Sequence, residues 1–404
     1  MIRTGIDIVE IARIEKAVKR HGGFLSRFFS EEECARFTEK KNAFERIAGH
    51  FAAKEAFSKF LGSGVRGFAL KDIVIDYDSL GKPYLIFRGG KVCADLSISH
   101  TKTSAVAVVC GEEYSQNFSA EYAEYAALLP GRNKEANKGD CGRMFIVAGS
   151  RGMTGAACLC AMSAMRTGSG LVTVGVPESQ QPVVACKITE AMTLSLPEGN
   201  GQLVRTALKD ILCRLERSDV CVFGPGLGDG EDIAAIAQGI LSQNKPVILD
   251  ADGINAVSRN INILKERNCE VVLTPHPGEM SRLTGKTIAQ IQAERVSTAV
   301  AFAKKYGVTV VLKGAGTVIA FPDGTFHINP TGNQGMATGG TGDVLAGVIG
   351  SLLGQGCSIR NAAVLGVFLH GYAGDLAAAD KGMPGMIASD VVEQLPYAIK
   401  NLKI

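Results

Sequence analysis

Apolar positions in the first 112 residues alternate between helical and extended spacing. Ile11, Ile14 and Val18 are three and four residues apart, which places them on one face of an amphipathic helix. A second helix is predicted over residues 48–60, followed by a turn at 62–67. β-Branched runs bounded by turn residues predict strands at 71–78, 82–87 and 105–110.

From residue 144 onward, short apolar runs alternate with helical segments. The runs MFIVAG, LVTVGV, DVCVFG, PVILDA, VVLTP, VTVVLKG and TVIAF predict buried strands, and helices are predicted at Gly155–Arg166 and Gln290–Tyr306. Such alternation is typical of parallel βαβ units with helices on both faces of the sheet. We therefore expect the α/β class.

A polar stretch separates the two patterns. Residues 111–140 contain only a short helix-like patch at 120–129, as expected for a connecting segment. The 404 residues exceed the usual size of one domain. We predict a first domain at 1–114, a linker or entry segment at 115–137 and a second domain at 138–404.

Composition excludes a disordered or collagen-like chain, because 46% of the residues are hydrophobic and 21% are charged. We found no apolar run of 18 residues and no signal-peptide pattern, so we expect a cytoplasmic protein without a membrane span. The 11 cysteines are odd in number and form no CxxC pair, which favours reduced structural thiols over disulfides or zinc.

Positive charge is concentrated in the first domain. Residues 1–112 hold 18 basic and 14 acidic residues, an excess too small to indicate nucleic-acid binding. Arg13, Lys16 and Arg20 repeat the helical spacing on the face opposite Ile11. This stripe is either a solvated face or a docking surface for an acidic partner.

Two carboxylates and two lysines, Lys54 and Lys59, are spaced to converge in the first domain and suggest a metal and phosphate site. Asp7 is expected at a strand end, and Glu55 precedes Lys59 by one helical turn. Mg²⁺ prefers a few carboxylates together with water and substrate phosphates. Taken singly, Asp7 is equally compatible with a helix N-cap, and Glu55 with Lys59 forms an ordinary surface pair.

In combination, these residues resemble the short, holo-acyl-carrier-protein synthase type of phosphopantetheinyl transferase. The resemblance covers residues 1–112 through GIDIVEIARIE, RFFSEEE, HFAAKEAFSKFLGSG and LSISHT. It implies a small α+β domain that transfers phosphopantetheine from coenzyme A to a serine of apo acyl carrier protein. It also implies a homo-oligomer with active sites between subunits.

The same resemblance implies a role for each matching residue. Asp7 and Glu55 would bind Mg²⁺, and Lys59 and His100 would lie near the coenzyme A phosphates. The serine would be deprotonated by a metal-bound water or by a carboxylate, for which Glu55 is the candidate. The Arg13, Lys16 and Arg20 stripe would dock the acidic carrier protein.

The second domain contains a glycine-rich loop that opens a helix. The segment from Asn329 to Asp343 leads into an apolar helix at 344–353, and such a loop presents backbone N–H groups and a helix N-terminus to anions. Asp343 is placed as a base in the first helical turn. Lys313–Thr317 and the loop that contains His276 follow two strands, where an α/β sheet forms its ligand crevice.

These motifs resemble the ribokinase-like superfamily and, within it, the ADP- or ATP-dependent NAD(P)H-hydrate dehydratases. The match runs from Lys138 to Pro396 and includes NKGDCGRMFIVAGSRGMTGAA, FGPGLG, VILDADGINA, TPHPGEMSRL and NPTGNQGMATGGTGDVLAGVIG. It implies an α/β/α sandwich around a mainly parallel sheet. It also implies repair of NAD(P)HX by phosphorylation of the ring hydroxyl and elimination of phosphate.

The resemblance assigns residues to the two ligands of this reaction. Asp343 would be the base and contact the hydrated ring, while Gly342 would bind the phosphate anion. The nucleotide would be bound by Lys313, Gly314, Ala315, Gly316 and Thr317. NAD(P)HX would be bound by His276, Gly226, Gly228 and Ala156. No residue decides between ADP and ATP. An epimerase for the hydrates is expected as a separate protein.

Two other interpretations stay open on the sequence. The second domain is compatible with a vitamin or sugar kinase of the same fold, which would release a stable phosphorylated product. The first domain is compatible with a non-catalytic docking or oligomerisation module.

Overall fold

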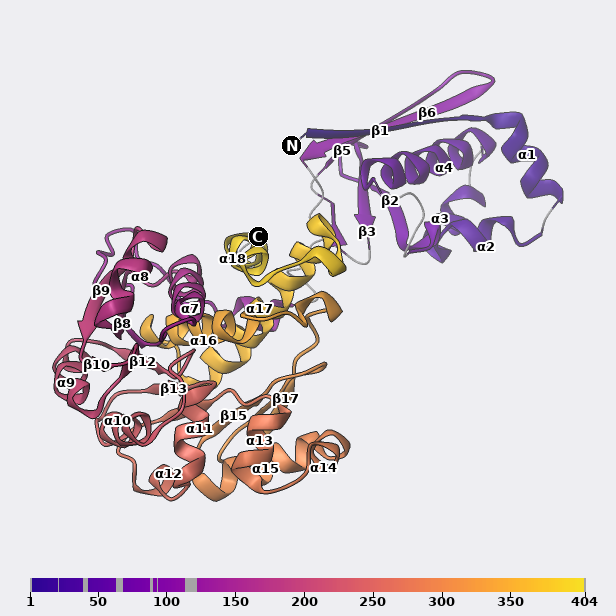
Figure 1. Ribbon diagram of the computed structural model, residues 1–404. Coiled ribbons are helices and arrows are strands. Elements are labelled where there is room, and N and C mark those ends of the chain that lie inside the picture. The colour runs from indigo at the N-terminus through magenta and orange to yellow at the C-terminus, as the bar shows by residue number, and fades with distance from the viewer. Residues whose placement is uncertain are drawn as a thin grey trace. The chain divides into compact units, whose positions relative to one another are not determined.

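The computed structural model divides the chain into two compact units, Met1–Glu121 and Tyr122–Ile404 (Figure 1). It describes residues 2–20, 22–38, 43–62, 68–87, 90–92, 94–112 and 122–402. Most of the turn predicted at 62–67 lies outside the described residues.

The first unit combines two small antiparallel sheets with four helices among its described residues. The helices are α1 (Ile11–Arg20), α2 (Phe24–Phe28), α3 (Glu31–Thr38) and α4 (Ala43–Phe60). One sheet has the order β1 (Ile2–Glu10), β6 (Ser104–Glu112), β5 (Ala94–His100), and the other β2 (Ile73–Tyr77), β3 (Pro83–Phe87), β4 (Gly90–Lys91).

Helix α4 packs on one face of the β1, β6, β5 sheet and forms the centre of the first core (Figure 1). Alternate residues of β1, Gly5 and Val9, are buried beneath it, whereas Ile6 and Ile8 on the other face are exposed. This one-sided burial is common in antiparallel sheets. The small α+β architecture is confirmed.

The second unit is larger and contains most of the secondary structure. Its strands are β7 (Arg143–Val147), β8 (Leu171–Pro177), β9 (Met192–Leu196), β10 (Glu198–Gly199), β11 (Gln202–Leu203), β12 (Val220–Phe223), β13 (Val247–Leu249), β14 (Val271–Leu273), β15 (Thr309–Leu312), β16 (Val318–Ala320) and β17 (Phe326–Ile328). Its helices are α6 (Ala123–Ala126), α7 (Thr154–Thr167), α8 (Gln181–Lys187), α9 (Leu208–Glu216), α10 (Glu231–Leu241), α11 (Asp252–Arg259), α12 (Ile263–Glu266), α13 (Pro277–Thr284), α14 (Ile288–Ala293), α15 (Arg295–Tyr306), α16 (Thr341–Gly354), α17 (Ile359–Lys381) and α18 (Ala388–Leu402).

A nine-stranded sheet runs through the described part of this unit in the order β17-β16-β15-β14-β13-β12-β7-β8-β9. The strands from β15 to β9 are parallel, and β16 and β17 are antiparallel additions at one edge. One core contains residues of α7, α8, α16 and α17, and the other contains residues of α9 to α15. The predicted α/β/α sandwich is confirmed.

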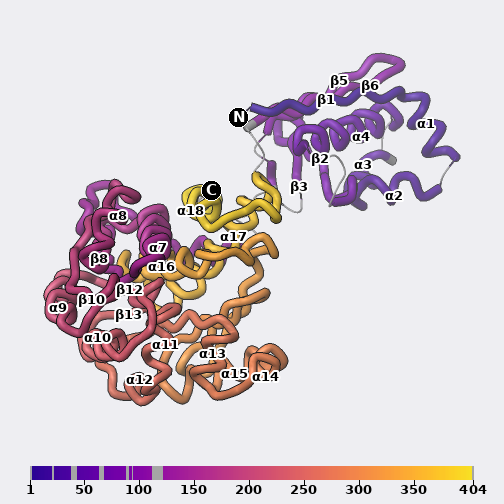
Figure 2. Tube along the Cα trace, viewed as in Figure 1, coloured from indigo at the N-terminus to yellow at the C-terminus, as the bar shows by residue number. Residues whose placement is uncertain are grey.

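The Cα trace shows how neighbouring helices cover the sheet, with α7 beside α16 and α10 beside α11 (Figure 2). The chain order reverses between β7 and β12, because β8 and β9 continue to one side and β13 to β15 to the other. Ligands of open α/β sheets bind outside the carboxyl ends of the strands at such a switch point.

The segment predicted as a linker is divided. Residues 113–121 lie outside the described residues, and the residues from Tyr122 onward belong to the second unit. Tyr125 of α6 stacks on Phe368 of α17 with ring centroids 3.9 Å apart, and its hydroxyl lies 2.9 Å from Nε2 of His327. Much of this polar stretch is therefore an integral part of the second unit.

The helix predicted at Gln290–Tyr306 is wrong as a single element. The chain forms α14 and α15 instead, since Glu294 between them has the non-helical angles φ −129° and ψ 45°. Thr287 accepts a hydrogen bond from the backbone N–H of Gln290 and caps the start of α14, a helix of six residues that ends at the break. The strands β9 and β17 were not predicted.

Helix α17 is long and apolar enough to cross a membrane by length and composition, with a mean hydropathy of 1.3. However, 72% of that stretch is buried inside the unit. Its residues pack against β15, α16 and α18, so the helix is part of the core of the second unit.

Candidate functional sites

The sequence predicted Asp7 at a strand end. This is wrong, because Asp7 lies inside β1. The strand continues because β1 pairs with β6 along its whole length, from Ile2 opposite Glu112 to Glu10 opposite Ser104. The Asp7 side chain is 17% exposed and belongs to the face that packs on α4. The strand thus holds this carboxylate against the helix.

Gly5 allows β1 to approach the backbone of α4. A Cβ added to Gly5 would lie 2.0 Å from the backbone oxygen of Ala56 and 2.5 Å from the backbone nitrogen of Phe60. No side chain fits at such distances, so glycine is required by this contact. Asp7, two residues along the same face, consequently reaches the part of α4 that carries Glu55 and Lys59.

The three predicted residues of the first site meet here. Lys59 Nζ lies 2.8 Å from Asp7 Oδ1 and 3.0 Å from the backbone oxygen of Ile6. Burial raises the pKa of Glu55, and the negative charge of Asp7 raises it further. Lys59 is therefore an ion-pair partner of the first carboxylate and not simply the surface partner of Glu55.

The carboxylate pair suits a hard divalent cation. We found no group of three or more potential metal ligands among the described residues, so a caged metal is not indicated there. Mg²⁺ is commonly held by one or two carboxylates together with water and phosphate oxygens. Because the negative charge of Asp7 raises the pKa of Glu55, a bound cation would relieve the repulsion between the two carboxylates.

His100 lies at the end of β5, on the same face of the sheet as Asp7. The register places His100 opposite Ala105 of β6, which in turn pairs with Val9 of β1. Its side chain is exposed, and Nδ1 lies 3.4 Å from the backbone oxygen of Thr101. The histidine is thus near the edge of the site but apart from the Asp7–Lys59 ion pair.

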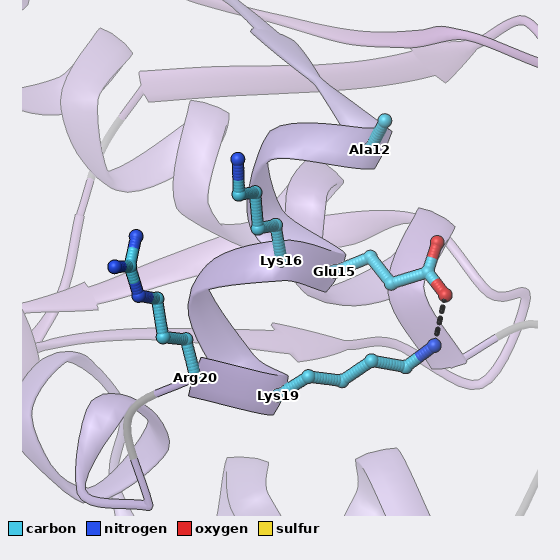
Figure 3. Close-up of a pocket in the computed structure, with 5 residues that line it drawn as sticks. All are labelled: Ala12, Glu15, Lys16, Lys19 and Arg20. Carbon is cyan, nitrogen blue, oxygen red and sulfur yellow. Dashed lines mark hydrogen bonds and ion pairs between the residues drawn. The ribbon is translucent and has the colours of Figure 1, made fainter.

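The basic stripe lies on the exposed face of α1. Arg13, Lys16 and Arg20 are exposed, while Ile11 and Ile14 point into the core. A surface hollow of about 440 Å³ is lined by Ala12, Glu15, Lys16, Lys19 and Arg20. Figure 3 shows Lys16 and Arg20 extending to one side of the helix, and Lys19 paired with Glu15 at 2.5 Å on the other. Arg13 lies outside this hollow.

The expectation that Lys54 converges with the carboxylates of the first site is wrong, because Lys54 belongs to a fully buried charged network behind that site. Lys54 Nζ lies 2.7 Å from Glu33 Oε2 and donates to three backbone oxygens, those of Phe28, Leu70 and Ile73. His50 contacts the other oxygen of Glu33 at 3.3 Å. This network ties α3 and β2 to α4, so Lys54 supports the helix that carries Glu55.

In the second unit, the predicted loops gather at the carboxyl ends of the parallel strands. Next to the switch point, the loops after β7 and β12 are joined by a hydrogen bond from Gly149 N to Pro225 O at 2.8 Å. A Cβ added to Gly226 would lie 3.0 Å from Cβ of Ala156, so these two predicted NAD(P)HX residues are neighbours. Gly228 donates to Asp252 at 2.8 Å.

A cavity of about 900 Å³ lies next to this region. Its walls include the predicted residues His276, Lys313, Gly314, Ala315, Gly316, Thr317 and Gly342, together with the segment 329–334 and residues of α17. The size is typical of sites for small molecules and cofactors. The lining does not include Ala156, Gly226, Gly228 or Asp343, so the predicted residues divide between the cavity and its surroundings.

Asp343 lies in the first turn of α16, as predicted, next to a cluster of charges. Gly340 precedes the helix with φ 93°, a left-handed conformation that favours glycine. Burial and the neighbouring charge of Asp250 raise the pKa of Asp343 to about 7. A carboxyl that titrates near neutral pH is suited to accept and release a proton.

Lys313 provides the positive charge of this cluster. Its Nζ lies 2.6 Å from Asp250 Oδ1 and 3.8 Å from Glu279 Oε2. Burial alone would lower the pKa of Lys313, but the charges of Asp250 and Glu279 raise it overall. Lys313 therefore stays a cation at the wall of the cavity.

His276 combines a structural position with exposure to the cavity. It is the N-cap of α13, where its Nδ1 accepts from Gly278 N at 2.9 Å and Glu279 accepts from His276 N at 2.7 Å. Burial and the nearby Lys313 lower the pKa of the His276 ring. The capping bonds hold the neutral ring in place beside the glycine turn of residues 314–316.

Two residues of this site, Asp250 and Glu279, were not predicted to belong to it, and His370 was given no role. Asp250 is a buried carboxylate that directly follows β13, and Glu279 is a buried carboxylate in the N-terminal cap of α13. Their position as acidic residues after parallel strands was the signal in the sequence that could have identified them. His370 of α17, to which no role was given, lines the cavity. Burial lowers the pKa of His370 to about 4, and its Nε2 has no partner among the described residues.

Family models match both units. The model of NAD(P)H-hydrate dehydratase matches residues 144–397, and that of the 4′-phosphopantetheinyl transferase superfamily matches residues 3–115. A bifunctional NAD(P)H-hydrate repair enzyme of Moorella thermoacetica is 47% identical over 277 residues, which cover 68% of this chain and 52% of that protein. The chain thus spans about half the length of this relative.

Shorter relatives match over most of their length. An ADP-dependent (S)-NAD(P)H-hydrate dehydratase of Neisseria meningitidis is 38% identical across 65% of this chain and 87% of its own. The Bacillus subtilis ADP/ATP-dependent NAD(P)H-hydrate dehydratase crystallised with ATP and Mg²⁺ has a TM-score of 0.60 and 32% identity, covering 69% of this chain and 96% of its own. The chain therefore belongs to the NAD(P)H-hydrate dehydratase family, preceded by a unit that matches the 4′-phosphopantetheinyl transferase superfamily.

Proposed function

We propose that the chain is a bifunctional enzyme with one reaction centre in each unit. The first unit transfers 4′-phosphopantetheine from coenzyme A to a serine of apo acyl carrier protein. The second repairs (6S)-NAD(P)HX to NAD(P)H with ADP or ATP. The match of each unit to a different enzyme family supports this division.

For the first reaction, the supporting observation is the convergence of Asp7, Glu55 and Lys59 where β1 meets α4. Asp7 and Glu55 would hold Mg²⁺, which supplies charge neutralisation at the pyrophosphate oxygens. Lys59 gives up its contact with Asp7, and its ammonium group then binds and orients a phosphate oxygen. His100, on the same face of the sheet, adds a ring nitrogen toward the coenzyme A phosphates.

The carrier-protein serine attacks the pyrophosphate phosphorus that bears the pantetheine arm. The serine proton passes to Glu55, the bond to the adenosine-side phosphate breaks, and 3′,5′-ADP leaves. The exposed Arg13, Lys16 and Arg20 dock the acidic carrier protein, since complementary charge guides association.

We further propose that the first unit forms a homo-oligomer through the outer face of β1. Ile2, Ile6 and Ile8 are 76%, 56% and 69% exposed on that face. A row of large apolar side chains on one sheet face is typical of an interaction surface, and a second copy of the chain covers it. Light scattering after size exclusion tests this, and a strictly monomeric chain would contradict it.

For the second reaction, the supporting observation is Asp343 at the N-terminus of α16, beside Lys313 and the cavity. The loop at 313–317 holds the nucleotide phosphates with Lys313 and backbone N–H groups. Asp343 removes the proton of the ring hydroxyl, and that oxygen attacks the terminal phosphorus of ADP or ATP. The phosphoanhydride bond breaks, and AMP or ADP leaves. Gly342 and the helix N-terminus stabilise the transferred phosphoryl group.

Phosphorylation converts the hydroxyl into a good leaving group. Phosphate then leaves with the electron pair of the breaking carbon–oxygen bond. The neighbouring ring carbon loses a proton to the departing phosphate, and the electron pair of that carbon–hydrogen bond becomes the restored double bond of the dihydropyridine. The chain's own residues supply only orientation, charge stabilisation and proton transfer. Ala156, Gly226, Gly228 and His276 bind the hydrated nicotinamide side, and a separate epimerase supplies the S epimer.

Incubation of the full chain with NADHX and either ADP or ATP tests the repair activity. We expect the absorbance of NADH to return with at least one donor. Accumulation of a phosphorylated alcohol without NADH would favour a kinase of the same fold instead.

A mass assay on apo acyl carrier protein tests the transfer activity. The expected result is a mass increase by one phosphopantetheine that depends on coenzyme A and Mg²⁺. An unmodified carrier protein that still binds the chain would favour a docking module.

A further inference from the structure

Asp250 follows β13 directly and is the most enclosed carboxylate of the second site. Its side chain is 1% exposed. Oδ1 accepts from Thr274 Oγ1 at 2.7 Å and from Lys313 Nζ at 2.6 Å. These donors come from residues that follow β14 and β15, so Asp250 links three neighbouring strands.

The backbone after Asp250 is strained. Ala251 has φ 46° and ψ −114°, which an L-residue with a side chain rarely adopts. Such strained conformations are unfavourable and cluster at functional sites. Ala251 separates Asp250, which contacts Lys313, from Asp252, which accepts from Gly228. The strained residue thus directs two carboxylates to two different loops of the site.

The Asp250–Lys313 pair lies under the first turn of α16. A Cβ added to Gly342 would be 3.3 Å from Lys313 Nζ and 3.9 Å from Asp250 Oδ2. Asp343 is the next residue. The charged groups that act on it are Asp250, Lys313, Asp252 and Glu279, and its own charge acts on Cys160 of α7.

We propose that Asp250 is a positioning residue of the repair site: it fixes the Lys313 ammonium below the first turn of α16 and places a negative charge next to Gly342, the residue before Asp343. The inference rests on the proposed dehydratase function. Lys313 is thereby held ready for a phosphate without reorganisation during the reaction. The same carboxylate opposes ionisation of the base until the pH approaches neutrality.

The matched variants are Asp250→Asn, Lys313→Met and Thr274→Val. Asparagine keeps an oxygen for Thr274 and Lys313 but removes the charge. Lys313→Met removes the cation that opposes Asp250, and Thr274→Val removes only one hydroxyl donor. If Asp250 acts through its charge, the first two variants shift the titration of Asp343 in opposite directions and the third leaves it in place.

The primary measurement is the side-chain carboxyl titration of the full chain by ¹³C NMR, with Asp343→Asn to assign the signal. We expect the Asp343 midpoint to fall by roughly one pH unit or more in Asp250→Asn, the size of a close charge interaction. It should rise in Lys313→Met. An unchanged midpoint in a folded Asp250→Asn variant would overturn the proposal.

The acid limb of kcat/KM for NADHX provides the second measurement, because it reports the base of the free enzyme. It should move to lower pH in Asp250→Asn and stay in place in Thr274→Val. If the wild-type chain lacks repair activity but its Asp343 midpoint still falls in Asp250→Asn, the proposed function is refuted and the positioning role stands. Equal loss of activity in both variants without any shift would reduce Asp250 to a structural residue.

Discussion

The two units place charge in different surroundings. In the first, Asp7 and Lys59 form an ion pair at the surface, where the lysine is 54% exposed. In the second, Asp250 is 1% and Lys313 is 19% exposed, and the pair lies at the wall of a cavity of about 900 Å³. Charges interact more strongly where water is excluded.

This difference indicates how each site is completed. The second unit lines its cavity with the loops after β14, β15 and β17 and with residues of α16 and α17, so the proposed nucleotide would enter a largely formed site. The first unit offers a carboxylate pair, a basic helix and an exposed apolar sheet face. Under the proposed function, it would need a cation, a carrier protein and a second copy of the chain to enclose its reaction.

The largest expected effect is the loss of repair in Asp343→Asn. Removing a general base typically costs about 10²- to 10⁴-fold in rate, and we expect a loss of this size in kcat for NADHX. Phosphopantetheine transfer should keep its wild-type rate. Absorbance of NADH and carrier-protein mass measure the two activities, and a fall in both would contradict separate reaction centres.

The reciprocal variants, Asp7→Ala and Glu55→Ala, should remove transfer and spare repair. Each loses one of the two carboxylates proposed to hold Mg²⁺, and the loss of one electrostatic contributor commonly costs about 10²- to 10³-fold. Ala12→Ser, in the exposed turn of α1, is a control that leaves both carboxylates in place. Full transfer activity in Asp7→Ala would contradict the proposal that Asp7 binds the metal.

Lys54→Ala tests the buried support of the first site. Burial alone would raise the pKa of Glu33, but His50 and Lys54 lower it, so its carboxylate remains charged in the core. Removing one partner of a buried pair costs about 3–5 kcal/mol. Hydrogen exchange followed in peptides from α4 at increasing urea concentration gives the urea midpoint of unfolding, and a lower midpoint measures this loss of stability.

Lys82→Ala is the matched control, because Lys82 pairs with Asp95 at the surface, where the two side chains are 63% and 82% exposed. Exposed pairs contribute about 0–1 kcal/mol. Equal midpoints for the two variants would mean that the buried network does not stabilise the unit.

A smaller effect is expected for Gly5→Ala. The added methyl group would overlap the backbone of α4, and overpacking of this kind typically costs about 1–3 kcal/mol. Displacement of β1 should also separate Asp7 from Glu55 and slow transfer. Gly22→Ala is the control, since a Cβ there meets no atom within 4 Å. Transfer at the wild-type rate in Gly5→Ala would show that the close approach is not needed.

Periodicity was sufficient to predict the α/β class and most strands of the second unit, because fully buried parallel strands are continuous apolar runs. It failed at Glu294, where a backbone break interrupts an otherwise helical pattern. The edge strand β17 was missed because Phe326 and Ile328 are exposed and its run is only three residues long. Short edge elements depend on pairing more than on their own sequence.

The motifs indicated the residues of both sites but not their partners. The helical spacing of Glu55 and Lys59 suggested a pair, whereas Lys59 bonds to Asp7, 52 positions away in the chain. The role of Asp250 was missed, and Lys54 was expected at the first site and not in a buried network, because their contacts are buried and join distant parts of the chain. Such contacts follow from the tertiary fold, and local pattern carries no information about them.

The most direct test of the account is to measure both reactions with one preparation of the wild-type chain. The same purified protein should load apo acyl carrier protein with phosphopantetheine from coenzyme A and restore NADH from NADHX with ADP or ATP. Neither substrate set should inhibit the other reaction. A chain that performs only one reaction, or in which coenzyme A and NADHX compete, would contradict two independent reaction centres.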